Sequence, residues 1–512
     1  MQSRVARLIL AVIVACCTGV ALAGSASAHA SLKQTTPRAD QVVTEPPSQI
    51  TLEFSAPVDA GFGGVTVLGP TGGRADIGVV NTLNDSATLV VPVDATESGT
   101  YTVSWRVTSQ DGHTIDGAFV VHVREKSASA TGAARPLTFV TILALIGRWM
   151  AYIAAFLCVG LGVASLCGAS LATWPRAAWI ALGWVLVVGM VVVLVTRVAQ
   201  ASGQGIIDAL DLVSRFVRHN RSGTLDALRV ALAIGAAVVC SFRRFRAYGL
   251  ALVGIAILVT YSLSGHAWTS AHRGYAVAVD MVHVTSSAIW LGGLMVLTMT
   301  RLDRAVLTKF SAVATAALIA TLLSAATSTM THVDAWAGLA ETRYGQVLRA
   351  KAVVVAIVAA LGWVNRRNIE HHLERAISGV RREAVVGLAV LLLTSMIVAE
   401  PPATESLYVP FDERTSTTSG VTQLSIEPTR VGPNELHVTF TTSAGTQRPV
   451  DAAEVSIAGP GVEKRVVPTK ISSADHLVAS EVVFGARGVW TITISQVTGD
   501  QTDIATFEVK IR

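Results

Sequence analysis

The sequence predicts a multi-domain membrane protein in which an all-β sandwich precedes a bundle of about eight transmembrane helices, and a second small β-sandwich follows. Only 15% of the 512 residues are charged, well below the roughly 25% of ordinary soluble domains. The deficit lies between residues 138 and 400, where apolar runs long enough to cross a bilayer recur. The flanks instead carry short alternating runs separated by turn residues, a pattern typical of antiparallel β-structure.

The first 28 residues predict a secretory signal peptide. They have a positively charged start, an apolar stretch and the small-residue cleavage site Ala26-Ser27-Ala28. Cleavage after Ala28 would make His29 the new amino terminus. The alternative is a lipoprotein-type cleavage at Cys16, which would leave His29 in a different position in the mature chain.

Residues 29–124 predict an immunoglobulin-like or cupredoxin-like sandwich, because several short strands follow one another without an intervening helix. The expected strands are 49–54, 64–68, 87–91, 101–107 and 118–123. Residues 125–137 are rich in small residues and predict a linker.

Residues 138–400 predict the membrane domain. The expected segments are 138–165, 177–199, 227–242, 247–265, 275–299, 310–331, 347–364 and 384–400, and the third is the weakest because it carries Arg229. Basic residues concentrate in the loops after segments one, three, five and seven, which the positive-inside rule places in the cytoplasm. The stretch between 199 and 227 is interpreted as a long outer loop. An even number of spans puts both β-domains outside a cell membrane.

Residues 403–512 predict the second sandwich, also outside the membrane. The expected strands are 436–441, 454–458, 477–484, 490–496 and 506–511. This part contains His437 and His476 but no methionine or cysteine, and its sequence predicts no binding site.

Composition excludes several classes of function. All five cysteines lie in the signal segment or in the apolar region, so neither β-domain has a disulfide framework or a CxxC metal motif. The net charge of +5 comes largely from loop arginines and does not indicate a nucleic-acid partner. No GxxxxGK[ST] loop is present, so no ATP-driven step is predicted. An inside-negative potential favours cation entry by about 2.3 kcal/mol per charge per 100 mV, which favours import.

A metal site is predicted in the first domain. Asp111 and His113 directly follow a strand and are two residues apart, so an extended segment places both on one side. A free His29 adds its α-amine and its ring nitrogen. Three nitrogens and one carboxylate oxygen in a tetragonal plane suit Cu(II). The alternative is a turn in which Asp111 caps backbone amides. His122, which alternates with apolar neighbours, is interpreted as structural.

A second group of metal-binding side chains is predicted between 255 and 332. Its members are His266, His272, Asp280, Met281, His283, Met330 and His332. Asp280 and His283 are three residues apart and share a helix face. A histidine within an apolar helix is costly without a partner, so these residues predict the outer mouth of a metal path. The alternative readings are polar helix ends for His266 and His272 and packing residues for the methionines; Lys351 is expected to extend to the membrane interface.

Residues 29–124 resemble the CopC family of periplasmic copper-binding proteins. The resemblance rests on His29-Ala30-Ser31-Leu32, the strand 101–107 and Asp111-Gly112-His113. It implies Cu(II) ligation by His29, Asp111 and His113. Some members also bind Cu(I) through methionines, but this domain has none, so no Cu(I) site is expected in it.

Residues 140–400 resemble the CopD family of membrane copper proteins. The matching motifs are Ser264-Gly265-His266-Ala267, Asp280 to His283 and Trp290-Leu291-Gly292-Gly293. A fusion of the two families implies copper transfer across the lipid bilayer, in uptake or in resistance, with copper delivered by a periplasmic or extracellular donor. The oxidation state of the transferred copper and the oligomeric state stay open.

Three other functions are compatible with parts of the sequence. A membrane haem or electron-transfer protein would use histidine pairs as axial ligands. A copper oxygenase would use an amino-terminal histidine, although Asp111 then fills a coordination position. A copper sensor or buffer would need the helices only as an anchor. No enzymatic activity is expected.

Overall fold

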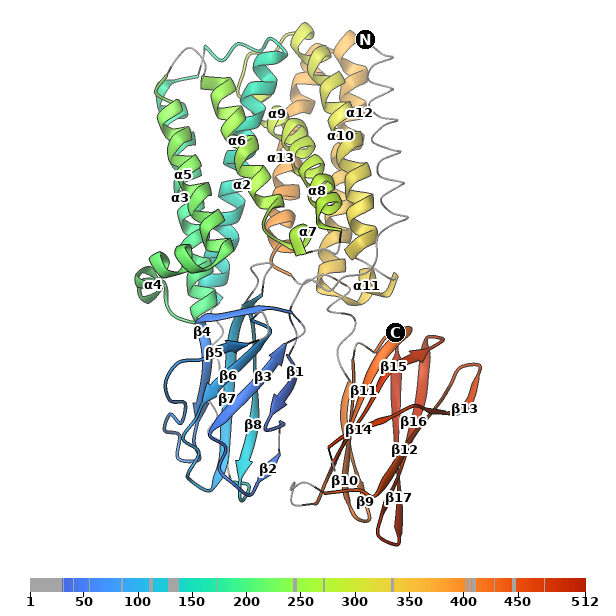
Figure 1. Ribbon diagram of the computed structural model, residues 1–512. Helices are drawn as coiled ribbons and strands as arrows, with labels where there is room; N and C mark the ends of the chain where they lie inside the picture. Colours follow the sequence, from blue (N-terminus) through green and yellow to red (C-terminus); the bar gives the residue numbers. More distant parts are fainter. Residues whose placement is uncertain are drawn as a thin grey trace.

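The computed structural model comprises two β-domains and a helical bundle, and both β-domains lie at the same end of the bundle (Figure 1). It describes residues 30, 32–39, 41–54, 56–83, 86–109, 114–127, 138–172, 174–242, 246–269, 272–332, 336–400, 403, 407, 411–427, 429–443, 448–473 and 475–512. The predicted signal peptide and most of the predicted linker lie outside these residues.

The first domain is a sandwich of two four-stranded sheets. One sheet has the order β1 (Leu32–Thr36), β3 (Gln49–Phe54), β6 (Thr88–Pro92), β5 (Asn81–Leu83); the other has β2 (Val42–Val43), β8 (Thr114–Val123), β7 (Gly99–Ser109), β4 (Val58–Leu68). All neighbours are antiparallel except β2 and β8. Leu52, Leu89, Val67 and Val103 from the two sheets are fully buried between them. All five expected strands are present; β1 and β5 were missed because they are short and largely polar, and β2 because it has only two residues.

The last domain is also a two-sheet sandwich. Its five-stranded sheet contains β14 (Lys470–Ser473), β15 (His476–Phe484), β11 (Gly432–Thr441), β10 (Gly420–Glu427) and β9 (Phe411–Thr417) in that order; the four-stranded sheet contains β13 (Val462–Val467), β12 (Ala452–Gly459), β16 (Gly488–Thr498) and β17 (Gln501–Ile511). The alternation of buried and exposed residues that predicted strands in this domain is clear in β17, where every second residue from Asp503 onward is buried. Phe440, Phe484 and Trp490 fill the core.

Each of the eight predicted membrane segments coincides with a helix. These helices are α2 (Thr138–Leu166), α3 (Arg176–Ser202), α5 (Arg221–Val239), α6 (Arg246–Ser262), α8 (Arg273–Ser287) with its continuation, α10 (Arg304–His332), α12 (Arg343–His371) and α13 (Leu373–Ile397). Six of them are long and apolar enough to cross a membrane, within the part of the chain that is described. The exceptions are α6, which has only 17 residues, and α13, which carries Arg381, Arg382 and Glu383. Six candidate spans are therefore established, and eight spans stay a prediction.

The interpretation of residues 199–227 as a long loop was wrong. This stretch contains the 14-residue helix α4 (Ile206–His219), and α5 begins at Arg221, six residues before the expected start. Ala209 and Phe216 of α4 are buried in a cluster with the end of α3, while Ile207 is 81% exposed. Apolar residues at three- and four-residue spacing were the signal for this amphipathic helix. Two further short helices, α7 (His266–Thr269) and α11 (Trp336–Glu341), were also missed.

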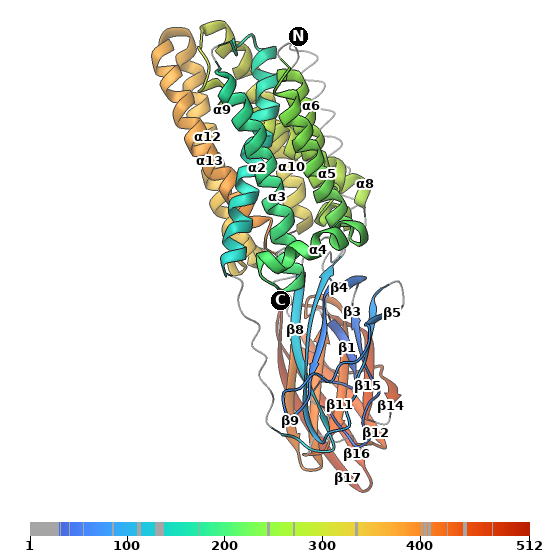
Figure 2. The same cartoon turned by 90° about the vertical axis from the view of Figure 1, so that its left-hand side faces the viewer.

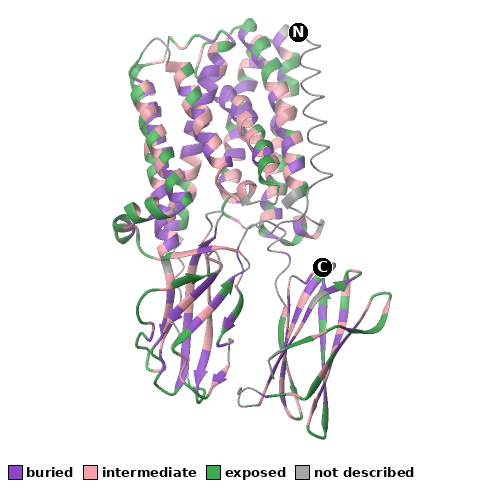
Figure 3. Cartoon of the chain, in the orientation of Figure 1, coloured by how far each residue is buried: buried purple, intermediate pink, exposed green. Residues whose placement is uncertain are grey.

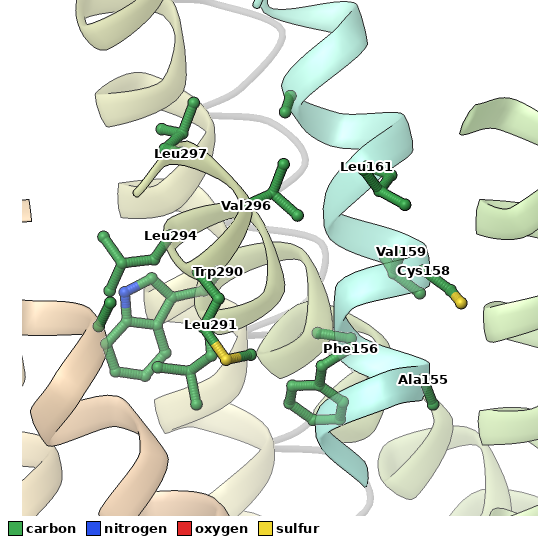
Figure 4. Close-up of a cluster of buried hydrophobic side chains, with 14 of the residues drawn as sticks. Ala155, Phe156, Cys158, Val159, Leu161, Trp290, Leu291, Leu294, Val296 and Leu297 are labelled. Atoms are coloured by element: carbon green, nitrogen blue, oxygen red, sulfur yellow. The ribbon is translucent and has the colours of Figure 1, made fainter. Parts of the chain in front are cut away.

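The fifth predicted membrane segment contains a wider, π-helical turn where it packs against α2. Helix α8 continues through a π-helical turn, η1 (Ala288–Gly292), into α9 (Gly293–Leu297). A Cβ atom at Gly292 would overlap the carbonyl oxygen of Phe156, and one at Gly160 would overlap the backbone of Gly292. Figure 4 shows the turn that carries Trp290 and Leu291 running next to α2 with Phe156 and Val159, while the Trp290 ring and Leu294 point to the side away from α2. The close helix approach predicted from Gly292-Gly293 is thus confirmed.

Burial follows this architecture. Purple, buried positions concentrate along the facing sides of the helices and inside each sandwich, whereas α4 is largely exposed (Figure 3). The ends of β4 and β7 contact α3, and both Figure 1 and Figure 2 show the first domain under α3 and α4.

Candidate functional site

The first part of the candidate site is one end of the first sandwich. Strand β7 ends at Ser109 and β8 begins at Thr114, whereas His29, Asp111 and His113 lie outside the described residues. Ala30 is 4% exposed, and its backbone N–H donates to the Ser109 hydroxyl at 3.1 Å. Ala30, which follows His29, is therefore hydrogen-bonded to Ser109, the residue directly before the 110–113 segment.

This end of the sandwich faces the helices. Asp59 of β4 pairs with Thr108 in the sheet, and its Oδ2 accepts a hydrogen bond from Asn220 Nδ2 at 3.0 Å. The side-chain Oδ1 of Asn220 accepts hydrogen bonds from the backbone N–H groups of Ser222 and Gly223, so the same side chain caps α5. One residue thus begins a membrane helix and holds the β-domain against it.

A buried ion network begins at Asp226, six residues after Asn220 along α5. Asp226 and Arg229 are both 1% exposed and form an ion pair three residues apart. Arg229 also donates from Nη2 to the Thr260 carbonyl oxygen at 2.7 Å on α6, and Arg197 Nε of α3 lies 3.2 Å from Asp226 Oδ2. The network joins three helices. Sequence reasoning noted Arg229 only as a weakness, although the spacing of Asp226 and Arg229 on an apolar helix could have revealed the pair.

The second part of the candidate site is a polar cluster between α8, α10 and α12. His283 Nδ1 lies 3.2 Å from both the Thr321 carbonyl oxygen and the Ser324 hydroxyl. Because a carbonyl oxygen only accepts, a neutral His283 carries its proton on Nδ1, which leaves the lone pair on Nε2 available to a cation.

Two charged side chains accompany His283. Lys351 of α12 lies within electrostatic reach of both His283 and Asp280. Lys351 is half-buried, and its expected extension to the membrane interface stays a prediction. The structure therefore brings Asp280 and His283 of the predicted path together and adds Lys351, Thr321 and Ser324, which were not among the predicted ligands.

The other predicted path residues are more scattered. His272 is exposed immediately before α8, and Met281 is half-buried on that helix. Met330 of α10 is 62% exposed. The backbones of His266 and His332 lie in α7 and α10, and their side chains lie outside the described residues.

Aromatic and basic residues border the end of this region that faces the β-domains. The guanidinium carbon of Arg221 lies 3.6 Å from the centre of a Trp268 ring, and that of Arg273 lies 5.4 Å from it. Such cation–π contacts hold the ends of α5, α7 and α8 together beside His266.

His122 has the structural role expected of it. It is 4% exposed, and its Nδ1 lies 2.9 Å from the Thr100 hydroxyl. A buried ring with a hydrogen-bond partner requires no ligand.

Three parts of the chain match known families. Residues 32–124 match the CopC domain, residues 139–276 match the copper resistance protein D-like N-terminal domain, and residues 304–399 match copper resistance protein D. The matches fall on the first sandwich and on the two halves of the helical bundle.

Individual relatives agree with these matches. The chain is 22% identical to the copper transport protein CutJ of Bacillus subtilis, over 93% of this chain and 94% of CutJ. The first domain is 38% identical to protein YobA of Escherichia coli, over 19% of this chain and 80% of YobA. The crystal structure of PcoC, a methionine-rich copper resistance protein from Escherichia coli, is 30% identical, covers 19% of this chain and 99% of PcoC, and has a TM-score of 0.17.

Proposed function

Because this chain belongs to the copper resistance and copper transport proteins that join a CopC domain to copper resistance protein D domains, we propose that it binds Cu(II) outside the membrane and passes copper into its helical domain. The proposed Cu(II) ligands are the α-amine and ring of His29, the carboxylate of Asp111 and the ring of His113.

The hydrogen bond between Ala30 and Ser109 is the observation that carries this proposal. His29 precedes Ala30 by one residue, and Asp111 follows Ser109 by two. Because one residue spans at most about 3.6 Å of extended chain, the backbones of His29 and Asp111 can each be only a few ångströms from the hydrogen-bonded residues Ala30 and Ser109. The remaining ligand, His113, directly precedes the first residue of β8, which pairs with the end of β7.

The donor set favours Cu(II) over Cu(I) at this site. Nitrogen and oxygen donors suit the harder cupric ion, whereas cuprous ion prefers thioethers and thiolates. Residues 29–124 contain no methionine and no cysteine that could provide such ligands.

The route onward runs through the contact of Asp59 with Asn220. It holds the copper-binding end of the sandwich against the outer ends of α3, α4 and α5. Inside the bundle, the free Nε2 of His283 is the proposed first ligand, and the nearby Asp280 carboxylate supplies compensating negative charge. Inward movement follows the membrane potential.

The proposed orientation places both β-domains outside the cell. They lie at the same end of the bundle (Figure 1). Helices α6, α10 and α13 begin at the other end and carry Arg246, Arg304 and Arg375 in their first turns, as the positive-inside rule requires of the cytoplasmic side.

The decisive experiment compares Cu(II) affinity with and without one extra residue before His29. The purified mature chain is titrated with Cu(II) against a competing chelator, and its first residue is identified by amino-terminal sequencing. We expect sequencing to begin at His29 and the extension to weaken binding strongly, because it converts the α-amine into an amide. A carboxyl-terminal extension of equal length is the control. Equal affinity with the amino-terminal extension would refute the amine ligand.

A further inference from the structure

Two histidines of the last domain, 39 residues apart in sequence, meet on its five-stranded sheet. His437 Nδ1 lies 3.1 Å from His476 Nε2. His437 projects from β11 and His476 from β15, and the two strands pair so that Val438 lies opposite Leu477. The register places the two rings diagonally across the ladder on one face.

A carboxylate orients one of the rings. Glu435 is two residues before His437 on β11, so both side chains lie on the same face. Glu435 Oε1 lies 3.4 Å from His437 Nε2. A proton on Nε2 facing this carboxylate leaves the His437 Nδ1 lone pair directed at His476, as in the carboxylate–histidine arrangement that supports metal ligands.

The histidine pair lies where the two β-domains meet. His476 is only 5% exposed, although Leu477 and Ala479 beside it fill the sandwich core and alternation places His476 on the opposite face. The neighbouring Asp475 forms an ion pair with Arg38 of the first domain at 3.4 Å. Figure 1 shows β1 and β2 on the side of the first domain that faces the last one.

The surroundings keep the His476 ring neutral. Burial lowers the pKa of His476 to about 4, and the charges of Arg38 and His437 act in the same direction.

We propose that His437 and His476 form a second copper site, which binds Cu(I) through His437 Nδ1 and His476 Nε2. In the described parts of the chain, no three His, Cys, Asp or Glu side chains converge as a metal site, so zinc would lack its usual four ligands. Cuprous ion accepts two-coordinate ligation, and imidazole is among its ligands. The ion would take the place of the hydrogen between the two nitrogens after a small separation of the rings, and that proton would move to His476 Nδ1 as the neutral ring changes tautomer.

This site is independent of the proposed Cu(II) site in the first domain. The test uses the full chain in nanodiscs, with Cu(I) under reducing conditions and a chromophoric Cu(I) chelator as competitor. Two double variants are compared with the parent: His437→Asn with His476→Asn, and Asp111→Ala with His113→Ala. We expect the first to lose one equivalent of tightly bound Cu(I) and the second to retain it.

X-ray absorption at the copper edge gives a readout that a merely structural pair would not change. The parent and the Asp111/His113 variant should show the edge feature of two-coordinate Cu(I), and the His437/His476 variant should not. His219→Asn, an exposed histidine of α4, is the matched control. Unchanged Cu(I) stoichiometry in the His437/His476 variant would overturn the proposal, and a fall in melting temperature without any copper loss would identify the pair as a hydrogen bond only.

Discussion

Asp59 of the first sandwich accepts a hydrogen bond at 3.0 Å from Asn220, the residue that caps membrane helix α5. The contact joins the first β-domain to the helical bundle six residues before Asp226, which forms the buried pair with Arg229. A single side-chain amide thus caps a helix and contacts the β-domain that packs against it.

The first prediction concerns this contact. Asn220→Asp keeps a good helix cap but places a second carboxylate against Asp59, so the domain contact is lost. Copper accumulation by cells should fall several-fold while Cu(II) affinity of the first domain stays unchanged. Asp59→Asn, which retains an acceptor for Asn220, is the control. Normal accumulation in Asn220→Asp cells would show that the contact is not needed for delivery.

The second prediction concerns Ser109. Ser109→Ala leaves the buried N–H of Ala30 without its acceptor, at a cost of about 1–3 kcal/mol. If this bond holds His29 beside the 110–113 segment, Cu(II) affinity should fall about ten-fold in a chelator competition assay. Ser109→Thr keeps the hydroxyl and should bind like the parent. An unaltered affinity in a folded Ser109→Ala protein would contradict the assigned role.

The third prediction concerns helix packing. Gly292→Ala places a methyl group against the backbone of α2, and overpacking costs about 1–3 kcal/mol. Detergent-solubilised protein should melt at a lower temperature. Gly235→Ala on α5, where nothing lies within 4 Å of the new Cβ, should be neutral or slightly stabilising. Equal melting of the two variants would show that α2 and η1 can separate freely.

The fourth prediction concerns His283. His283→Ala removes the ring whose Nε2 we propose as the first intramembrane ligand, so copper accumulation should be lost. Cu(II) titration of the first domain should remain unchanged, because the two sites lie in separate domains. His219→Ala is the control on the exposed helix α4. A Soret band in the purified parent that disappears in His283→Ala would instead favour haem ligation.

The fifth prediction concerns the buried ion pair. Asp226→Ala leaves Arg229 buried without its carboxylate, which costs about 3–5 kcal/mol. Folded yield and the midpoint of chemical unfolding should both drop. Asp226→Ala combined with Arg229→Met should be more stable than Asp226→Ala alone, because no uncompensated charge remains. A double variant as unstable as the single one would mean that the arginine contributes mainly through packing.

The sequence by itself determined the order of domains, the longer strands and the helices of the bundle. Strand alternation and apolar runs are local properties, so β17 and α3 can be recognised without any knowledge of their neighbours. Local motifs also identified the copper family, because Asp111-Gly112-His113 and Gly292-Gly293 are contiguous. Short polar strands such as β5 carry no such pattern, and the charged start of α13 obscures its helical character.

Only the tertiary structure decided which distant residues meet. Ala30 reaches Ser109 across 79 residues, and His437 reaches His476 across 39, because sandwich topology and strand register bring separate segments together. The sequence showed Arg229 only as a charge in an apolar helix, whereas the structure shows that Thr260 of α6 bonds to it and that Arg197 of α3 joins its partner Asp226. Periodicity along the chain reports which face of an element is buried, but the identity of the neighbour across that face depends on how whole elements pack.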